Sequence, residues 1–542
     1  MTGAVLRTRP PATEPIGVAR EDIRLGKDVL ELVSSAMYVE PMTVYREYIQ
    51  NAADAVDAAR AAGILANGEP GRVEIGIDAA SRAITIRDNG AGIPGEEFAT
   101  RLTALGSSAK RGTSARGFRG VGRLVGLGYT QELIFRSRAR EEDEVLELRW
   151  DCRRLKAALS DPSFNSDVSD LISQIVSVTR VSGEDYPPHF FEVELAKVVR
   201  QRGDKLMNPS AVADYLAQVA PVPFSSDFRF GEDIVEALTA VGELGELDIR
   251  INAGEPLRRP HRNEIALSPV QVSAFDELSI VEIPGMDGDL AAVGWFLHHG
   301  YEGALPVGTL VKGVRLRVGN LQIGEQAILE DIFPESRFNA WSVGEIHIVD
   351  PRIVPNGRRD QFEQNVHFNN LVNHLGPSAR EIARRCRTNS ARRSKLREFE
   401  LISEDVRNQI LVLSQGGVDA TQRNNFALAV DAGLLRLAKI VETSQLIADR
   451  SDDMQAAIAD LRASLAEAME ETQAVGPLDR LPAQERAMYE KMFGLIYECS
   501  ANRNAAKSLV DRIIQKIADT VPPVPSAPAR REPGAAQRRR SS

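Results

Sequence analysis

Two polar clusters, about forty residues apart, constrain this chain more than any other feature of its sequence. The first is REYIQNAADAVDAAR, in which Glu47, Asn51 and Asp54 are spaced four and three residues apart. At that spacing the three side chains share one face of a helix, because positions three and four apart are neighbours on its surface. Two carboxylates and an amide are costly to bury unless something binds them. The segment therefore predicts a helix with a polar binding face.

The second cluster follows a predicted strand. The segment AITIRDNGAGIP alternates apolar and polar residues up to Asp88, and residues 89–92 then read as a turn. A glycine-rich run, GFRGVGRLVGLGY, begins at Gly117. Glycines before a helix leave backbone N–H groups free to face an anion, and the helix N-terminus adds partial positive charge. Carboxylates, a carboxamide and such a cradle together indicate a nucleotide with a divalent metal.

Each motif alone has an ordinary structural explanation. Glu47 and Asp54 suit a solvated helix face, Asp-Asn-Gly is a common turn, and the glycine run suits a flexible loop. The nucleotide site is the interpretation adopted here because all three motifs occur together and in order.

In this order and spacing, the three segments resemble the nucleotide-binding domain shared by gyrase B, the chaperone HtpG, histidine kinases and MutL, the GHKL superfamily. The resemblance implies a Bergerat-type α/β sandwich that binds ATP and Mg²⁺. It implies that Glu47 is the general base orienting the attacking water and that Asn51 is the magnesium ligand. It also implies that Asp88 accepts the adenine amino group and that Gly92 lets the backbone approach the base. Asp54 completes the nucleotide-facing side of the helix.

Residues 106–118, GSSAKRGTSARGF, are small, polar and basic without an apolar period, so we expect a mobile loop. They match the lid that folds over ATP in HtpG-type proteins. The resemblance implies nucleotide contacts in the lid and the glycine run by Ser107, Ser108, Lys110, Gly117, Gly120, Val121 and Gly122. Lys110 is a candidate phosphate contact, and Arg111, Arg116, Arg119 and Arg123 could serve equally well. The ordinary structural explanation of Lys110 is a solvated loop lysine.

One position departs from the superfamily pattern. A threonine that helps to fix the adenine normally lies near the start of the domain's final strand. The best-matching position here is His189, before FFEVEL, and Thr179 is a more distant candidate. Which of the two replaces the threonine stays open.

A chain of 542 residues should divide into several domains rather than build one core. We predict an α/β multidomain fold with an N-terminal α/β sandwich, an α/β middle domain of alternating strands and helices, and an α-helical C-terminal region. Helices are predicted over 21–37 and 40–62, and strands over 71–78 and 82–88. The predicted parts are a disordered arm (1–17), the ATP-binding domain (18–228), the middle domain (229–375), the helical region (376–520) and a disordered tail (521–542).

The segment IHIVDPRIVPNGRRDQFEQNVHFNNLVNHL resembles the HtpG-type middle domain, where a strand ending in Asp leads to a loop and then a helix. On that match Asn356 and Arg359 occupy the key loop positions, with Asp360 behind them. The resemblance implies that Arg359 reaches across to the ATP γ-phosphate once the lid closes, as an arginine finger does. Arg358 is the alternative candidate for this role. The ordinary structural explanation of the segment is an exposed basic turn before a helix.

Composition argues against several classes of protein. No run approaches the roughly twenty apolar residues needed to cross a bilayer, and the first residues lack a signal-peptide core, so we expect a cytoplasmic protein without a membrane partner. Cys152, Cys386 and Cys499 are too widely spaced to indicate disulfides or zinc. His298 and His299 have no further ligands at metal spacing. The net charge of −10 argues mildly against nucleic-acid binding.

The predicted function is an ATP-hydrolysing, HtpG-like chaperone or chaperone-related ATPase that works by lid and domain closure on protein clients or partner proteins. Amphipathic repeats such as Ile458, Leu461, Leu465 and Met469 suit either a helical bundle or a dimer interface. The family resemblance favours a homodimer.

Two alternatives remain open at this point. One is a DNA-associated clamp of MutL or microrchidia type, with phosphate contacts from the cluster Arg380–Arg397 and from the tail. A solvated helix face is the simpler reading of that cluster, so nucleic acid is not the favoured partner. The other is a bacterial stress or defence ATPase with a separate partner.

Overall fold

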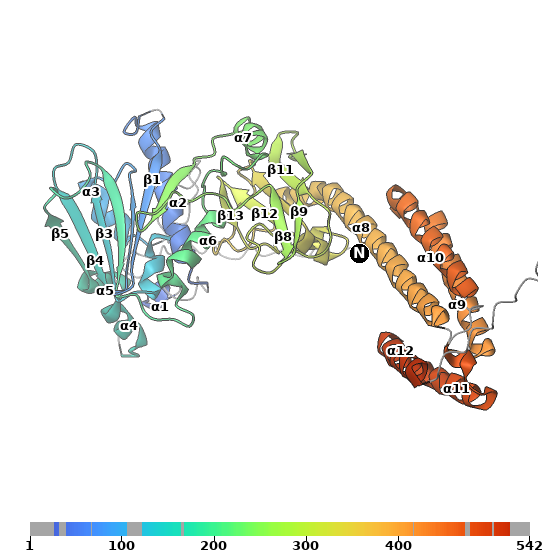
Figure 1. The fold of residues 1–542 in the computed structure, drawn as a ribbon. Helices are drawn as coiled ribbons and strands as arrows, with labels where there is room; N and C mark the ends of the chain where they lie inside the picture. Colours follow the sequence, from blue (N-terminus) through green and yellow to red (C-terminus); the bar gives the residue numbers. More distant parts are fainter. Residues whose placement is uncertain are drawn as a thin grey trace, which may run out of the picture. The chain divides into compact units, whose positions relative to one another are not determined.

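The computed structural model describes residues 26–31, 40–66, 68–105, 122–163, 167–415, 417–471, 477–500 and 503–520. The chain separates into two compact units, Met1–Cys386 and Arg387–Ser542. The first unit is built on two large sheets and the second is helical, as the predicted fold class requires (Figure 1). The predictions for the arm, the lid and the tail lie outside the described residues.

A seven-stranded sheet of order β5-β4-β3-β6-β2-β1-β7 organises the N-terminal domain. Neighbouring strands pair antiparallel, except β1 with β7, which are parallel. In β1, Val73, Ile75 and Ile77 are buried between exposed or half-exposed neighbours, so one face of the sheet carries the core. The strands are β1 (Gly71–Asp78), β2 (Ala83–Asp88), β3 (Glu132–Arg138), β4 (Val145–Asp151), β5 (Val176–Val181), β6 (Phe190–Ala196) and β7 (Leu247–Ile251).

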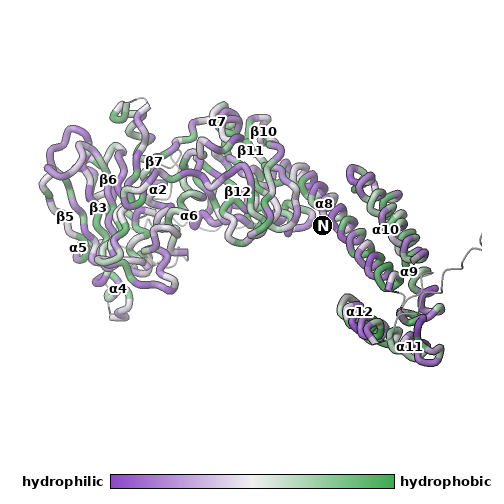
Figure 2. The backbone as a smooth tube through the Cα atoms, viewed as in Figure 1, coloured by the Kyte–Doolittle hydropathy of each residue, from purple (hydrophilic) through white to green (hydrophobic). Residues whose placement is uncertain are grey.

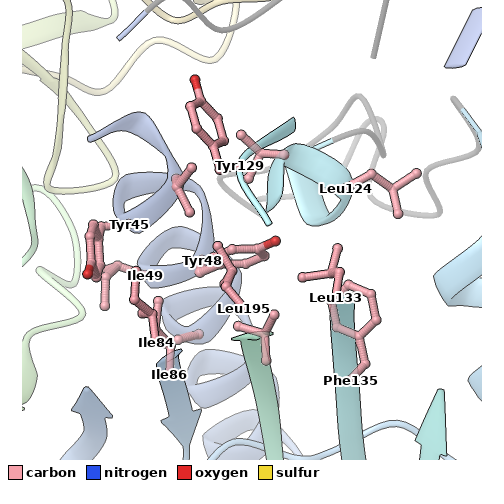
Figure 3. Packing of buried hydrophobic residues seen from close by; sticks show 14 of the residues in the cluster. Tyr45, Tyr48, Ile49, Ile84, Ile86, Leu124, Tyr129, Leu133, Phe135 and Leu195 are labelled. Atoms are coloured by element: carbon pink, nitrogen blue, oxygen red, sulfur yellow. The ribbon is translucent and has the colours of Figure 1, made fainter. Parts of the chain in front are cut away.

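Helices pack on that apolar face. Helix α2 (Thr43–Ala61) is the most deeply buried, and Figure 3 shows Tyr48 and Ile49 of α2 beside Ile84, Leu133 and Leu195 of the strands. The other described elements of this domain are α1 (Asp28–Glu31), α3 (Gly95–Thr103), η3 (Gly122–Gly128), α4 (Cys152–Ser160), α5 (Val168–Ile175), η4 (Lys205–Met207) and α6 (Pro209–Val219). Of the helix predicted over residues 21–37, the structure describes residues 26–31, and these include α1.

A five-stranded sheet of order β10-β11-β14-β12-β13 organises the middle domain. Its central strands β11 and β14 are buried on both faces, because separate apolar clusters cover each side. The elements are α7 (Gly231–Thr239), β8 (Glu264–Ser268), β9 (Gln271–Ala274), β10 (Glu277–Pro284), β11 (Leu290–His298), β12 (Gly313–Val318), β13 (Leu321–Ile323), η5 (Glu330–Ile332), η6 (Ser336–Trp341) and β14 (Val343–Ile348). Between residues 264 and 348 the structure has strands and short 3-10 helices but no α-helix, so the expected alternation of strands and helices is wrong there. The reason is that a short apolar run can form either a strand or a buried helix.

The boundary predicted at residues 228 and 229 also differs from the structure. The segment ELDIRINAG, expected in the middle domain, supplies β7 and pairs with β1 of the N-terminal sheet. Helix α7, which precedes β7, packs with Phe228 on the middle sheet. The chain therefore passes to the middle domain, returns to the N-terminal sheet and crosses again, because β7 satisfies its backbone groups at the free edge of β1.

The second predicted boundary, at residues 375 and 376, falls inside a single long helix, α8 (Val366–Ser414). Its first turns pack into the core of the middle domain through Leu371, Leu375, Ile382 and Cys386. The physical boundary therefore lies after Cys386, where the apolar contacts with the middle sheet end.

The second unit is formed by the rest of α8 with α9 (Ala420–Thr443), η7 (Gln445–Arg450), α10 (Ser451–Glu471), η8 (Pro477–Arg480), α11 (Ala483–Cys499) and α12 (Arg503–Thr520). Hydrophilic and hydrophobic positions are mixed along these helices (Figure 2). Ile458, Leu461 and Leu465 pack within the bundle, whereas Met469 is exposed. None of the helices that the structure describes combines the length and apolar composition that crossing a bilayer requires.

Candidate nucleotide site

Helix α2 carries the first polar cluster into the interior of the N-terminal domain. Glu47 is only 4% exposed, Asp54 is buried and Asn51 is half-buried, on successive turns of the helix. A buried face with two carboxylates is unfavourable in an otherwise apolar helix unless partners balance it. The face therefore carries ionisable groups into the interior of the domain, where they can serve a binding site.

The second cluster is packed directly against this helix. Asp88 is the last residue of β2 and is buried, and its Oδ1 accepts a hydrogen bond from the N–H of Gly90 at 2.9 Å. Gly90 lies so near α2 that a Cβ atom there would be 2.6 Å from the Cβ of Ala55. The N–H of Ala91 donates to the carbonyl of Ala55 at 3.2 Å. The turn thus brings the Asp88 carboxylate to the helix that carries Glu47.

Gly92 has a positive φ of 69°, and a Cβ atom there would collide with the backbone of Arg138. The close approach that this glycine permits in the structure is thus to the end of β3. His189 lies at the same turn, because its Nδ1 is 2.9 Å from the carbonyl oxygen of Gly90. Thr179 is exposed on the edge strand β5, four strands from β2. Of the two candidates for the missing threonine, only His189 contacts the Asp88 turn.

Two guanidinium groups lie beside Glu47. Its Oε1 is 3.5 Å from Nη2 of Arg46 and 3.8 Å from Nη1 of Arg359. Gly122, at the start of η3, faces Glu47 Oε2 so closely that any side chain there would collide with the carboxylate. The hydroxyl of Tyr48 donates to the carbonyl of Arg123 and accepts from the N–H of Gly126, both at 3.1 Å, which holds η3 against α2 (Figure 3).

The loop that carries Arg359 is internally bonded. Pro355 and Phe362 pair as an isolated bridge, and the side-chain amide of Asn356 donates to Asp360 at 2.7 Å. Arg359 has a φ of 57°, a left-handed conformation that is unfavourable for a residue with a long side chain and that only surrounding contacts sustain. The loop contacts therefore hold the backbone at Arg359 in this conformation.

Arg46 joins this loop to α2. It donates from Nη2 to the carbonyl of Arg358 at 3.1 Å and from Nη1 to the carbonyl of Arg359 at 3.4 Å. The guanidinium of Arg359 is thus held at Glu47, whereas the side chain of Arg358 is exposed. The sequence analysis does not identify Arg46 as a site residue. The only sequence feature that could have indicated it is a basic residue directly before Glu47 in the predicted helix.

Several donors near Glu47 have no hydrogen-bond acceptor. Within the described part of the chain, Nε of Arg46, Nε2 of Gln50 and Nη1 of Arg359 are buried and unpartnered. Buried donors are almost always satisfied in folded proteins, so these groups are available to a polar or anionic ligand. The groups present fit a nucleotide with magnesium: a carboxylate for adenine, an amide oxygen for the metal and guanidinium N–H groups for phosphate oxygens.

The remaining predicted contacts fall outside the described residues. This applies to Ser107, Ser108, Lys110, Gly117, Gly120 and Val121, and to the alternatives Arg111, Arg116 and Arg119. Arg123 is described: burial lowers its pKa, and its Nη2 donates to the carbonyl of Ala104.

Comparison with known proteins agrees with this geometry. Residues 39–175, which include α2 and β2, match the family model described as histidine kinase-, DNA gyrase B-, and HSP90-like ATPase. The chaperone protein HtpG of Polaromonas naphthalenivorans is 37% identical over 90 residues, that of Coxiella burnetii RSA 493 is 37% identical over 94, and that of Frankia casuarinae is 33% identical over 93. Each alignment covers 16% of this chain and 14% of the relative.

Residues 39–175 of the N-terminal domain are therefore of the GHKL type, as the sequence motifs predict. Within that superfamily, their local similarity is to the HtpG branch. Arg359 lies outside the matched family model.

Proposed function

We propose that this chain binds ATP with Mg²⁺ between α2 and the end of β2 and hydrolyses it with Glu47 and Arg359. The observation that supports the proposal most strongly is the 3.8 Å approach of Glu47 Oε1 to Nη1 of Arg359. These two residues come from different domains and are 312 positions apart in the sequence. The hydrogen bond from Arg46 to the carbonyl of Arg358 joins the same two segments. Such an encounter of a buried carboxylate with a guanidinium is expected where a nucleotide site is shared between two domains.

In the proposed site, each residue has a distinct chemical role. Asp88 accepts the adenine amino group, because a carboxylate offers only acceptors. Asn51 supplies an amide oxygen to Mg²⁺, which when bound neutralises charge on the phosphate oxygens. Glu47 orients the attacking water and takes its proton. Arg359 stabilises the negative charge that develops on the γ-phosphate oxygens.

We further propose that the ATPase cycle serves an HtpG-like chaperone or chaperone-related activity on protein clients, in a homodimer. The support is the local identity of 37% to proteins named chaperone protein HtpG. The test is ATP-dependent suppression of client aggregation by the full chain. Salt-dependent DNA binding without such suppression would instead favour the DNA-clamp alternative.

ATP turnover of the wild type and of three site variants tests the proposed chemistry. Glu47→Ala should bind ATP but lose turnover by about 10²–10⁴-fold. Arg359→Ala should bind ATP with turnover slower by on the order of 10²-fold or more. Asp88→Asn should lose binding, because its amide would place a donor opposite the adenine amino group.

Arg358→Ala is the matched control, because the neighbouring arginine contributes its carbonyl rather than its exposed side chain. Its turnover should stay near that of the wild type. Wild-type turnover in Glu47→Ala, or equal losses in Arg358→Ala and Arg359→Ala, would contradict the assignment.

A further inference from the structure

Two arginines of the middle domain hold the end of an N-terminal-domain helix. Arg315 and Arg317 lie two positions apart on β12 and are both buried. Arg317 donates to the carbonyls of Gln218 and Ala220, at the C-terminal end of α6. Arg315 donates from Nη1 to the side-chain oxygen of Gln218 at 3.1 Å. These contacts place positive charge at the negative end of the helix dipole and fix α6 to β12.

A series of hydrogen bonds connects the same Nη1 of Arg315 to the loop that carries Arg359. This Nη1 donates to Oε1 of Gln322, on the adjacent strand β13, at 2.8 Å. The amide of Gln322 in turn donates to the carbonyl of Gly324 at 2.9 Å. The N–H of Gly324 donates to the carbonyl of Arg359, also at 2.9 Å. Gly324 has a φ of 68° and a Cβ there would be 2.7 Å from the carbonyl oxygen of Asp360, so the loop is seated directly on this residue.

The path closes on helix α2. Arg46 of α2 donates to the carbonyls of Arg358 and Arg359 in the loop. At the other end, α6 packs against α2, and the hydroxyl of Tyr45 in α2 donates to the carbonyl of Leu206, just before α6, at 2.7 Å. Helix α2, helix α6, β12, β13 and the loop that carries Arg359 thus form a closed circuit of contacts, and Glu47 lies on α2 beside that loop.

The circuit is anchored by a buried carboxylate. Nε of Arg317 is 2.8 Å from Oε1 of Glu345, and Nη1 of Arg259 donates to Oε2 of Glu345 at 2.6 Å. Arg259 also donates to the carbonyl of Val222, just after α6. A buried polar network whose members bond one another has few alternative arrangements, so it holds its neighbours in one geometry.

We propose that Arg315 and Gln322 are positioning residues that hold the Arg359 loop at the distance from Glu47 that hydrolysis requires. Neither contacts Glu47, and both act through Gly324 on the carbonyl of Arg359. In this arrangement the contacts present the base and the arginine together. The inference rests on the proposed ATPase function.

Gln322→Met in the full chain is the direct test, because methionine keeps the side-chain length but removes the acceptor for Arg315 and the donor to Gly324. We expect kcat to fall about tenfold with KM for ATP changed less than about twofold, since a displaced catalytic group lowers the rate more than binding. The amide of Gly324 should exchange with deuterium faster, because its acceptor in the loop is released.

Gln409→Met is the matched control. Gln409 is 6% exposed against 4% for Gln322, and it bonds Asp405 within α8 in the helical unit. This variant should leave kcat and the exchange of Gly324 unchanged. If Gln322→Met does not fold, Gln218→Met removes only one acceptor of Arg315, and we expect a fall in kcat of about threefold.

A double-mutant cycle separates positioning from general destabilisation. If Gln322 acts through Arg359, Gln322→Met should cause no further loss of kcat in the Arg359→Ala background. An equal loss in both backgrounds, or unchanged kcat and unchanged Gly324 exchange in Gln322→Met, would overturn the inference. A wild type without ATP turnover would refute the proposed function, whereas the exchange of Gly324 still decides whether Gln322 holds the loop.

Discussion

The site on α2 and the cluster between β12 and β14 both bury arginines beside a carboxylate, yet they differ in how closely the charges are paired. Glu47 lies 3.5 and 3.8 Å from its two guanidinium neighbours. Glu345 lies 2.6 and 2.8 Å from Arg259 and Arg317. Loosely paired buried charge is expected where a ligand supplies the missing partner. Closely paired charge is expected where the protein supplies that partner itself.

The electrostatics of the middle cluster support that contrast. Burial opposes ionisation of Glu345, but Arg317 and Arg259 outweigh it and hold the pKa of Glu345 well below its ordinary value. Burial lowers the pKa of His261 to about 3 and that of His347 to about 4, although the negative charge of Glu345 acts to raise both values. The cluster is therefore built to carry one carboxylate among arginines and neutral histidines.

The largest effect expected of a single substitution is on stability. Glu345→Gln leaves buried arginines without their carboxylate and should lower the free energy of unfolding by about 3–5 kcal/mol. Urea unfolding measures the loss, with the exposed Glu325→Gln as a control that should change little. A loss below about 1 kcal/mol for Glu345→Gln would show that the two regions do not differ in this way.

A second effect follows from the neutral histidines. Their folded pKa values lie below the unfolded value, so the unfolded state binds more protons between about pH 6.5 and pH 4, and stability falls as the pH falls. His261 and His347 should each cost about 2 kcal/mol between pH 7 and pH 5. His298, with a pKa lowered to about 4 chiefly by burial, adds a loss of the same sign. Urea midpoints measured at pH 7, 6 and 5 test this, and a flat profile would contradict it.

A matched pair of buried glutamines gives the smallest and sharpest comparison. Gln50 on α2 is 2% exposed and has an unpartnered Nε2, whereas both ends of Gln322 are bonded. Gln50→Leu should leave the free energy of unfolding unchanged or raise it by up to about 1 kcal/mol, since it removes an unsatisfied donor. Gln322→Leu should lower that free energy by about 1–3 kcal/mol. Equal losses in the two variants would remove the distinction.

The parts that the sequence predicts best are those set by local spacing. The helix of Glu47 and Asn51, the two strands up to Asp88 and the helical C-terminal region are found where their periodicity places them. The loop of Arg359 was found through its resemblance to a known middle domain. The contact of Arg359 with Glu47 depends on the packing of distant segments, which sequence periodicity does not predict.

The parts that the sequence does not predict depend on which elements cover one another. The strand GVRLRV alternates like a half-exposed strand, but α6 covers the side of Arg315 and Arg317 and buries both. The return of β7 to the N-terminal sheet has no local signal, because any short apolar strand suits either sheet edge. Arg46 was missed for a related reason, since its partners are backbone carbonyls in another domain.

Calorimetric titration of the full chain with ATP and Mg²⁺ tests the central claim most directly. The account predicts saturable heat for one nucleotide per chain, abolished in Asp88→Asn and retained in Glu47→Ala. No heat with the folded wild type, or undiminished heat in Asp88→Asn, would contradict the nucleotide site at α2 and β2.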